Sequence, residues 1–405
     1  MDAVKILVIF LGMFVVIFKY KKSLTLAFAL GCIAVAAAYQ FELGFALKLA
    51  ARSAFSKSTL AIVAIYYTVT FLQKMMEARG HIALAEASLL GITNSKRSSA
   101  ALAPICAGLM PTPGAVIVGG AIVESIYKDS VSNEDKNFIT SYYRHIPESF
   151  VPTFGSVILA CELAKVPPGE FVFYMLPLAF LLIVLGHVMF MRKLPWETGL
   201  PGKRGKIQDV KNLFLSLWPV GVIIVCVLLV RVDVYIIAIF VIAAYFFVNK
   251  LKIKGIMPLF IASFESKLIL STVFIFIFKD YIFTVGAVES LSAFFSELPL
   301  PDYIIFSLIF FTGSVLVGAT GIVAIGMPLA YAAIPDGGVP LLVLLSSMAF
   351  AAMQISISHI CLFLSSTFFK VEVASLIKRT IPVMAVFCAL LVGYYLLLDR
   401  LKMAS

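Results

Sequence analysis

The chain has 405 residues, of which 61% are hydrophobic and 13% are charged, and its formal net charge is +10. A soluble globular domain contains about 25% charged residues, so this composition excludes an ordinary water-soluble protein. The basic residues lie in short runs between apolar segments, as the positive-inside rule describes for membrane proteins. We therefore expect a multi-pass protein of the lipid bilayer and no nucleic-acid partner.

The first half of the chain contains clean apolar runs, two amphipathic segments and two apolar segments that are interrupted by Gly and Pro. The clean runs are residues 4–18, 24–39, 59–75 and 171–191. The amphipathic segments are residues 41–57 and 77–94, and the interrupted segments are residues 98–125 and 146–165. The polar segment 128–144 and the basic segment 192–211 are expected to lie in the cytoplasm.

The second half repeats this order. Its apolar runs are residues 213–230, 234–248, 268–286 (interrupted by a charged pair) and 381–398, and its Gly- or polar-interrupted segments are residues 304–334 and 340–369. Lys279 and Asp280 lie within the third run, where they either pair with each other or mark the end of the helix. The matching order indicates that the two halves are related repeats.

The charge pattern allows one consistent topology. Segments 98–125 and 304–334 must each enter and leave the membrane on the same side, as re-entrant hairpins or pairs of short spans. The fold class is then an all-α polytopic protein with about ten spans and two hairpins, in two inverted-topology repeats. We expect the repeats at residues 1–195 and 213–405, a cytoplasmic linker at 196–212, and both termini outside the cytoplasm.

The hairpin tips are the first candidate binding residues. Breaks in membrane helices free backbone amides that attract anions, and carbonyl and hydroxyl oxygens that suit Na⁺. The alternative is that Gly and Pro only kink a packed helix. Two breaks at matching places favour function, and the candidates are Pro111, Thr112, Pro113, Gly114, Gly318, Thr320 and Gly321.

The broken segments after the hairpins supply the remaining candidates. Thr153, Gly155 and Ser156 follow a proline break and are expected to face the tip of the first hairpin. The second broken segment is polar for a membrane helix and contains Ser356, Ser358 and His359. We expect these residues either to bind the substrate or a proton, or to form hydrogen bonds with a neighbouring helix. Arg144 and His145 precede the first break and are two further candidates for contact with a proton or the substrate. The alternative for Arg144 is a position at the membrane interface, where long basic side chains are typical.

Several classes of chemistry lack a signature in this sequence. No phosphate-binding loop and no metalloprotease or serine-hydrolase motif occurs, so neither ATP-driven transport nor an enzyme is expected. The six cysteines lie singly in apolar stretches and the four histidines are scattered, so no metal site and no cofactor is expected beyond a coupling ion.

Three motifs resemble an uncharacterised prokaryotic membrane family, domain of unknown function 401, within the ion transporter superfamily. They are Pro111-Thr112-Pro113-Gly114-Ala115, Tyr143-Arg144-His145-Ile146, and Ser358-His359-Ile360-Cys361-Leu362 with Phe368-Phe369-Lys370. The resemblance runs from about residue 59 onward. This chain departs from the family pattern at two places. It has Ala115 where the family has a second Gly, and Ile357-Ser358 where the family has Ser-Pro.

The resemblance implies a function. The superfamily is related to permeases for gluconate, lactate, citrate and dicarboxylates, and implies re-entrant hairpins, a homodimer and elevator-type alternating access. We therefore expect a secondary active transporter of a small organic anion in the cell membrane, coupled to Na⁺ or H⁺. A facilitative channel-like pore and a lipid-acting membrane enzyme are the alternatives.

Overall fold

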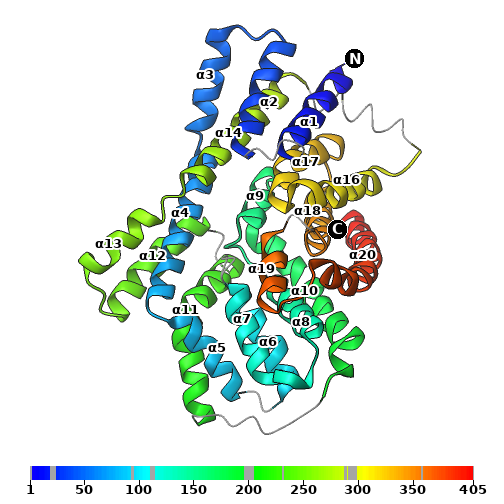
Figure 1. The fold of residues 1–405 in the computed structure, drawn as a ribbon. Helices are drawn as coiled ribbons and strands as arrows, with labels where there is room; N and C mark the ends of the chain where they lie inside the picture. The colour runs from blue at the N-terminus through cyan, green and yellow to red at the C-terminus, as the bar shows by residue number, and fades with distance from the viewer. Residues whose placement is uncertain are drawn as a thin grey trace.

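The computed structural model describes residues 2–18, 24–92, 95–109, 115–195, 205–229, 232–286, 290, 299–356 and 359–404. Every regular element in these ranges is a helix, which confirms the predicted all-α class. Figure 1 shows the helices packed into one body, with the two chain ends on the same side of the view.

Within the described residues, four helices are long and apolar enough to cross a membrane: α4 (Lys57–Ala78), α10 (Pro168–Met189), α11 (Lys206–Leu229) and α20 (Val373–Ala404). The pair α13 (Ile253–Ala262) and α14 (Ser266–Thr284) passes the same test together, with a bend of 49° between them, and makes a fifth span if the two helices cross as one broken span. Further apolar helices are only 10–17 residues long. The chain is a multi-pass membrane protein, and the total of about ten spans stays a prediction.

One group of helices lies around the two long helices α4 and α14 (Figure 1). It comprises α1 (Asp2–Phe18), α2 (Leu24–Ala38), α3 (Leu43–Ala54), α5 (His81–Ile92), α11, α12 (Val234–Val248) and α13. Helices α2 and α3 pack on α14, whereas α12 and α13 pack on α4. Each half of the chain therefore supplies short helices that cover the long helix of the other half.

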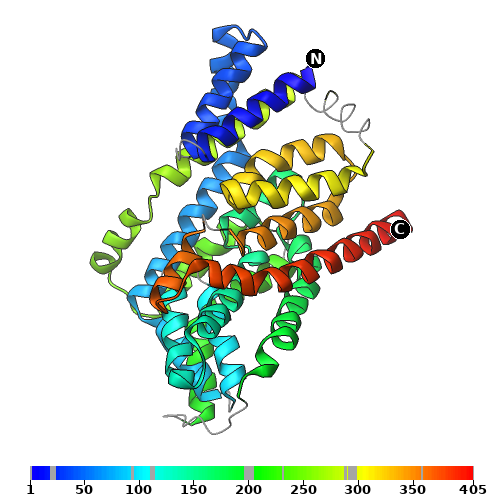
Figure 2. The ribbon, with the colours of Figure 1, turned by 45° about the vertical axis from the view of Figure 1, so that its right-hand side comes forward.

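The second group contains the interrupted segments. It comprises α6 (Lys96–Gly108), α7 (Ala115–Tyr127), α8 (Asn133–His145), η2 (Ile146–Ser149), α9 (Gly155–Ala164), α10, α16 (Asp302–Val317), α17 (Ala319–Ala333), α18 (Gly338–Met353), α19 (Ile360–Phe368) and α20. Helices α6 and α7 pack on each other, and so do α16 and α17, so both predicted hairpins are helix–break–helix pairs. Figure 2 shows α16, α17 and α18 side by side, in yellow to orange, with α20 in red.

The two halves make reciprocal contacts. Helix α9 packs on the second hairpin through α17, and α19 packs on the first hairpin through α7. Residues with positive φ also recur after corresponding helices, in the pairs Gln40 and Lys250, Gly80 and Gly286, and Lys165 and Lys370. Two repeats related by a two-fold axis would produce this pattern. Their inverted orientation and their boundaries stay predictions.

Helix α8 is polar in sequence but buried in the protein. It forms the second part of the polar segment 128–144, whose cytoplasmic position stays a prediction, and the neighbouring helices α6, α7, α19 and α20 cover it. The Ser132 hydroxyl accepts a hydrogen bond from the Asp135 amide and caps the helix. Acidic residues in its first turn and basic residues in its last turn complement the helix dipole. Its polar side chains have partners inside the protein, among them Ser365 and Ser366 for Asn137 and Glu148 for Arg144.

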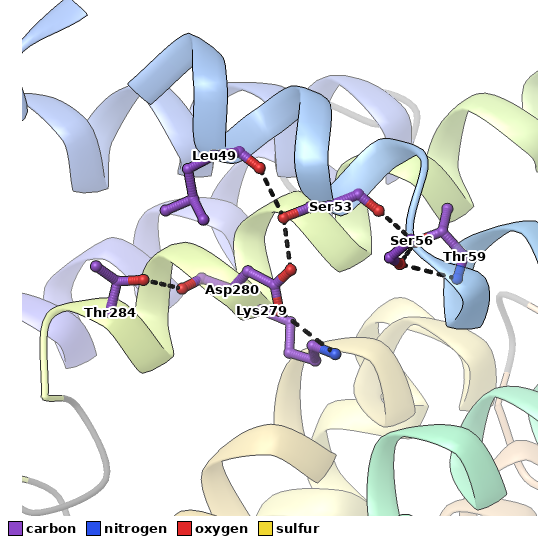
Figure 3. A network of polar contacts seen from close by, with 7 residues as sticks. All are labelled: Leu49, Ser53, Ser56, Thr59, Lys279, Asp280 and Thr284. Atoms are coloured by element: carbon purple, nitrogen blue, oxygen red, sulfur yellow. Dashed lines mark hydrogen bonds and ion pairs between the residues drawn. The ribbon is translucent and has the colours of Figure 1, made fainter. Parts of the chain in front are cut away.

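Lys279 and Asp280 have a structural role, drawn in Figure 3. Helix α14 continues past both residues, so the predicted pairing is confirmed and the predicted helix end is wrong. The Lys279 ammonium lies 3.5 Å from the Asp280 carboxylate, which also accepts a hydrogen bond of 2.5 Å from Ser53 on α3. The Thr59 hydroxyl donates to the Ser53 carbonyl at 2.7 Å. This network fixes the elbow between α3 and α4 against α14.

Candidate functional site

A small cavity lies where η2, α9, α17 and α18 meet. Polar side chains of Glu148, Ser149, Ser156 and Ser346 line it, together with apolar residues of α9, α17 and α18. The first turns of α9 and α17 both reach it, through Ser156 and Ala319 respectively. The broken helix of the first half and the second hairpin therefore form one site.

Neither helix that begins at this cavity has a side-chain cap. The N-cap residues are Phe154 for α9 and Gly318 for α17, and neither side chain accepts a hydrogen bond from the first turn. The first amides of a helix have no partner within the helix, and together with the helix dipole they favour an anion. Two such helix starts at one cavity form a site suited to a small anion.

The sharp turn at the second hairpin depends on one glycine. Gly318 separates α16 from α17 and has φ 80° and ψ 162°, a conformation that is essentially restricted to glycine. Because the break is a single residue, Thr320 and Gly321 already belong to the first turn of α17. The predicted tip on this hairpin is therefore a helix start rather than an unwound loop.

Two hydroxyl groups near the cavity have no hydrogen-bond partner among the described residues. They are the Thr153 Oγ1 atom, next to the start of α9, and the Ser346 Oγ atom on α18. A buried hydroxyl without a partner costs about 1–3 kcal/mol. A bound ion or ligand that accepts or donates here would recover this free energy.

Arg144 lies inside the protein, so its interpretation as an interface residue is wrong. Its side chain is only 2% exposed, and its Nη1 atom lies 2.9 Å from the Glu148 carboxylate one helical turn further on. This pair joins the end of α8 to the cavity, because Glu148 lines the cavity wall. Removing one partner of such a buried pair would leave the other charge without compensation.

The two predicted histidines of the breaks are in contact. The Nε2 atom of His145 lies 3.0 Å from the Nε2 atom of His359, although 214 residues separate them. His145 ends α8 before the first break, whereas His359 is the N-cap of α19 after the second break. The two histidines do not occupy equivalent places in the two halves, because Phe154 is the N-cap of the corresponding helix α9.

Further polar contacts hold α8 against α19 and the second break. The Asn137 side chain donates a 3.0 Å hydrogen bond to the Ser366 hydroxyl and accepts one of 2.5 Å from Ser365. The Ser356 hydroxyl donates to the Val315 carbonyl at 2.8 Å, in the last turn of α16 before the Gly318 break. Ser356 thus anchors the break to α16.

A hydrogen bond also joins the two groups of helices. The Tyr66 hydroxyl on α4 donates to the Gly155 carbonyl at the start of α9, over 3.0 Å. A Cβ atom at Gly155 would lie 2.9 Å from the Tyr66 ring, so only glycine permits this approach. The requirement for glycine at position 155 therefore comes from packing as well as from the helix start.

The structure brings together one subset of the predicted site residues. Thr153, Gly155 and Ser156 lie at the start of α9, which packs on α17 and so on the second hairpin. Their expected contact with the tip of the first hairpin stays a prediction, because that tip lies outside the described residues. The predicted residues Pro111, Thr112, Pro113, Gly114 and Ser358 lie outside the described residues. Sequence analysis did not include three cavity residues: Glu148, Ser149 and Ser346.

Comparisons with known proteins give a family and a fold. Residues 3–398 match the family described as "Protein of unknown function (DUF401)", which confirms the predicted resemblance. No curated protein matches the chain. Among solved structures, the fold is similar to the Alcanivorax borkumensis YdaH transporter, with a TM-score of 0.51 and 12% identity over 93% of this chain and 98% of the other.

Proposed function

This chain belongs to the DUF401 family, and from its site and its transporter-like fold we propose that it is a secondary active transporter of a small organic anion. The observation that carries the proposal is the meeting of two uncapped helix starts, α9 and α17, at one small cavity. Broken helices of this kind at a repeat interface are typical of the binding sites of secondary transporters.

The cavity also has ligands for a coupling cation. The Glu148 carboxylate and the hydroxyls of Ser149, Ser156 and Ser346 are oxygen donors of the kind that hard cations prefer. Helix amides would hold the substrate carboxylate, and these oxygens would hold Na⁺ beside it. Glu148 and His145 keep H⁺ as the alternative coupling ion.

The wider proposal concerns mechanism and location. We propose elevator-type alternating access, in which the helices that bear the cavity move against the group around α4 and α14, in a homodimer of the cell membrane with both termini outside the cytoplasm. The division of the helices into two groups supports this motion.

Transport into proteoliposomes tests the proposal. A thermal-shift screen of small carboxylates first identifies a ligand, because a ligand that binds the folded state raises its stability. Uptake of that ligand should saturate and should depend on a Na⁺ or H⁺ gradient. Saturable uptake should weaken in Ser346→Ala but not in Ser307→Ala, a buried control serine that bonds to its own helix. Uptake that does not saturate and does not depend on the Na⁺ or the H⁺ gradient would indicate a pore.

A further inference from the structure

Three side chains with metal-binding atoms meet at the contact between α8 and α19. The nitrogen atoms of His145 and His359 and the sulfur atom of Cys361 all lie within 4.8 Å of one another. His145 is fully buried and Cys361 is 3% exposed. None of the three lines the cavity described above, so this cluster is a separate feature.

The spacing of these atoms is close to that of ligands around one metal ion. A tetrahedral zinc ion with bonds of about 2.0–2.1 Å to nitrogen and about 2.3 Å to sulfur separates two nitrogens by about 3.3 Å, and nitrogen from sulfur by about 3.6 Å. The two Nε2 atoms are 3.0 Å apart, and no pair in the cluster exceeds 4.8 Å. Side-chain adjustments of about 1 Å would therefore complete the geometry.

A backbone carbonyl prepares one ligand for metal binding. The Nδ1 atom of His145 lies 2.5 Å from the Ser141 carbonyl oxygen. A carbonyl can only accept, so Nδ1 carries the proton and the Nε2 lone pair faces His359. Histidine ligands of metals commonly donate their second ring nitrogen in this way, which fixes the tautomer and the ring orientation.

We propose that His145, His359 and Cys361 bind a divalent transition-metal ion of the zinc class. Imidazole and thiolate ligands select such ions over Na⁺, Mg²⁺ or Ca²⁺. Three protein ligands leave one position of a tetrahedral ion for water or an anion. The ion would join α8 of the first half to α19 of the second. This site goes beyond the proposed transport function and does not rest on it.

Metal binding to the purified full-length protein tests this proposal without a transport assay. Competition with a chromophoric chelator should give about one zinc ion per chain for the wild type. Cobalt(II) should produce an intense thiolate-to-metal absorption band, because Cys361 supplies the only sulfur of the cluster. The Cys361→Ser variant should lose this band and bind zinc more than about 100-fold more weakly. The control Cys226→Ser, on α11, should behave as the wild type.

Two outcomes would overturn the proposal. One is a wild type that binds no stoichiometric zinc and gives no cobalt–thiolate band, which would leave the cluster as a hydrogen-bonded histidine pair. The other is a folded Cys361→Ser variant that keeps wild-type zinc affinity and spectrum. The wild-type cobalt spectrum decides the question even where the variant fails to fold.

Discussion

The contact between Gly108 and Arg144 offers a sharp test of how the first hairpin is held. Gly108 ends α6, and a Cβ atom placed there would lie 2.0 Å from the carbonyl oxygen of Arg144 and 2.9 Å from its carbonyl carbon. These are backbone atoms, so no side-chain rotation can relieve the clash. The Gly108→Ala substitution therefore has to separate α6 from the end of α8.

The size of the effect follows from this geometry. Ordinary contacts of a Cβ atom begin at 3.4 Å, so the 2.0 Å approach has to open by about 1.4 Å. Overpacking of this kind costs about 1–3 kcal/mol of unfolding free energy, and sometimes more. The shift would also move Arg144 and its partner Glu148, and a displacement of about 1 Å near a site can reduce a rate about 100-fold.

The matched control lies on the same hairpin. A Cβ atom at Gly119, on α7, would lie 3.3 Å from the Pro104 Cα atom, and its other neighbours lie at 3.6 Å or more. Gly119→Ala should therefore keep nearly wild-type stability and transport. Both variants are compared by unfolding in detergent and by uptake into proteoliposomes. If Gly108→Ala matches Gly119→Ala in both assays, the close packing of α6 on the Arg144 backbone is not what positions this hairpin.

Three further substitutions test other contacts. Glu148→Gln should destabilise the protein by about 3 kcal/mol in detergent unfolding, because it removes the carboxylate that pairs with the buried Arg144. Asn137→Ala should cost about 1–3 kcal/mol, since its side chain is fully buried and bonds two serines of α19. Gly318→Ala should cost about 1–3 kcal/mol through backbone strain alone, because no atom lies within 4 Å of the added Cβ.

Each of these expectations has an opposing result. Wild-type unfolding of Glu148→Gln would mean that other groups neutralise Arg144. An unchanged Asn137→Ala would mean that water replaces its bonds to α19. For Gly318, the control is Gly221→Ala on α11, where the added Cβ also meets no atom within 4 Å. Equal stability of the two variants would show that the positive φ carries no strain.

Sequence analysis identified the elements that carry function but not how they pair. Gly and Pro density located both hairpins and the first break, and polar residues located the second break, because interruptions in membrane helices leave a local composition signal. The pairing of α9 with α17 carries no such signal, since it depends on how the two halves pack.

Burial of polar residues was the second obstacle. The polar residues of α8 give no sign in the sequence that the helix is buried inside the protein. Some of their partners lie far along the chain: Asn137 bonds to two serines of α19, and Asp135 pairs with Arg379 on α20. Cys361 likewise gave no metal signal, because its neighbours His145 and His359 come from distant segments.

The hydrogen bond from Tyr66 to the Gly155 carbonyl has a consequence for conformational equilibrium. It joins a helix of the group around α4 and α14 to the start of α9, so it exists only in states that keep these two helices in register. A neutral hydrogen bond contributes about 1 kcal/mol, which changes a ratio of two states about fivefold. The Tyr66→Phe substitution would thus shift the protein away from the conformation described here without altering the groups that line the cavity.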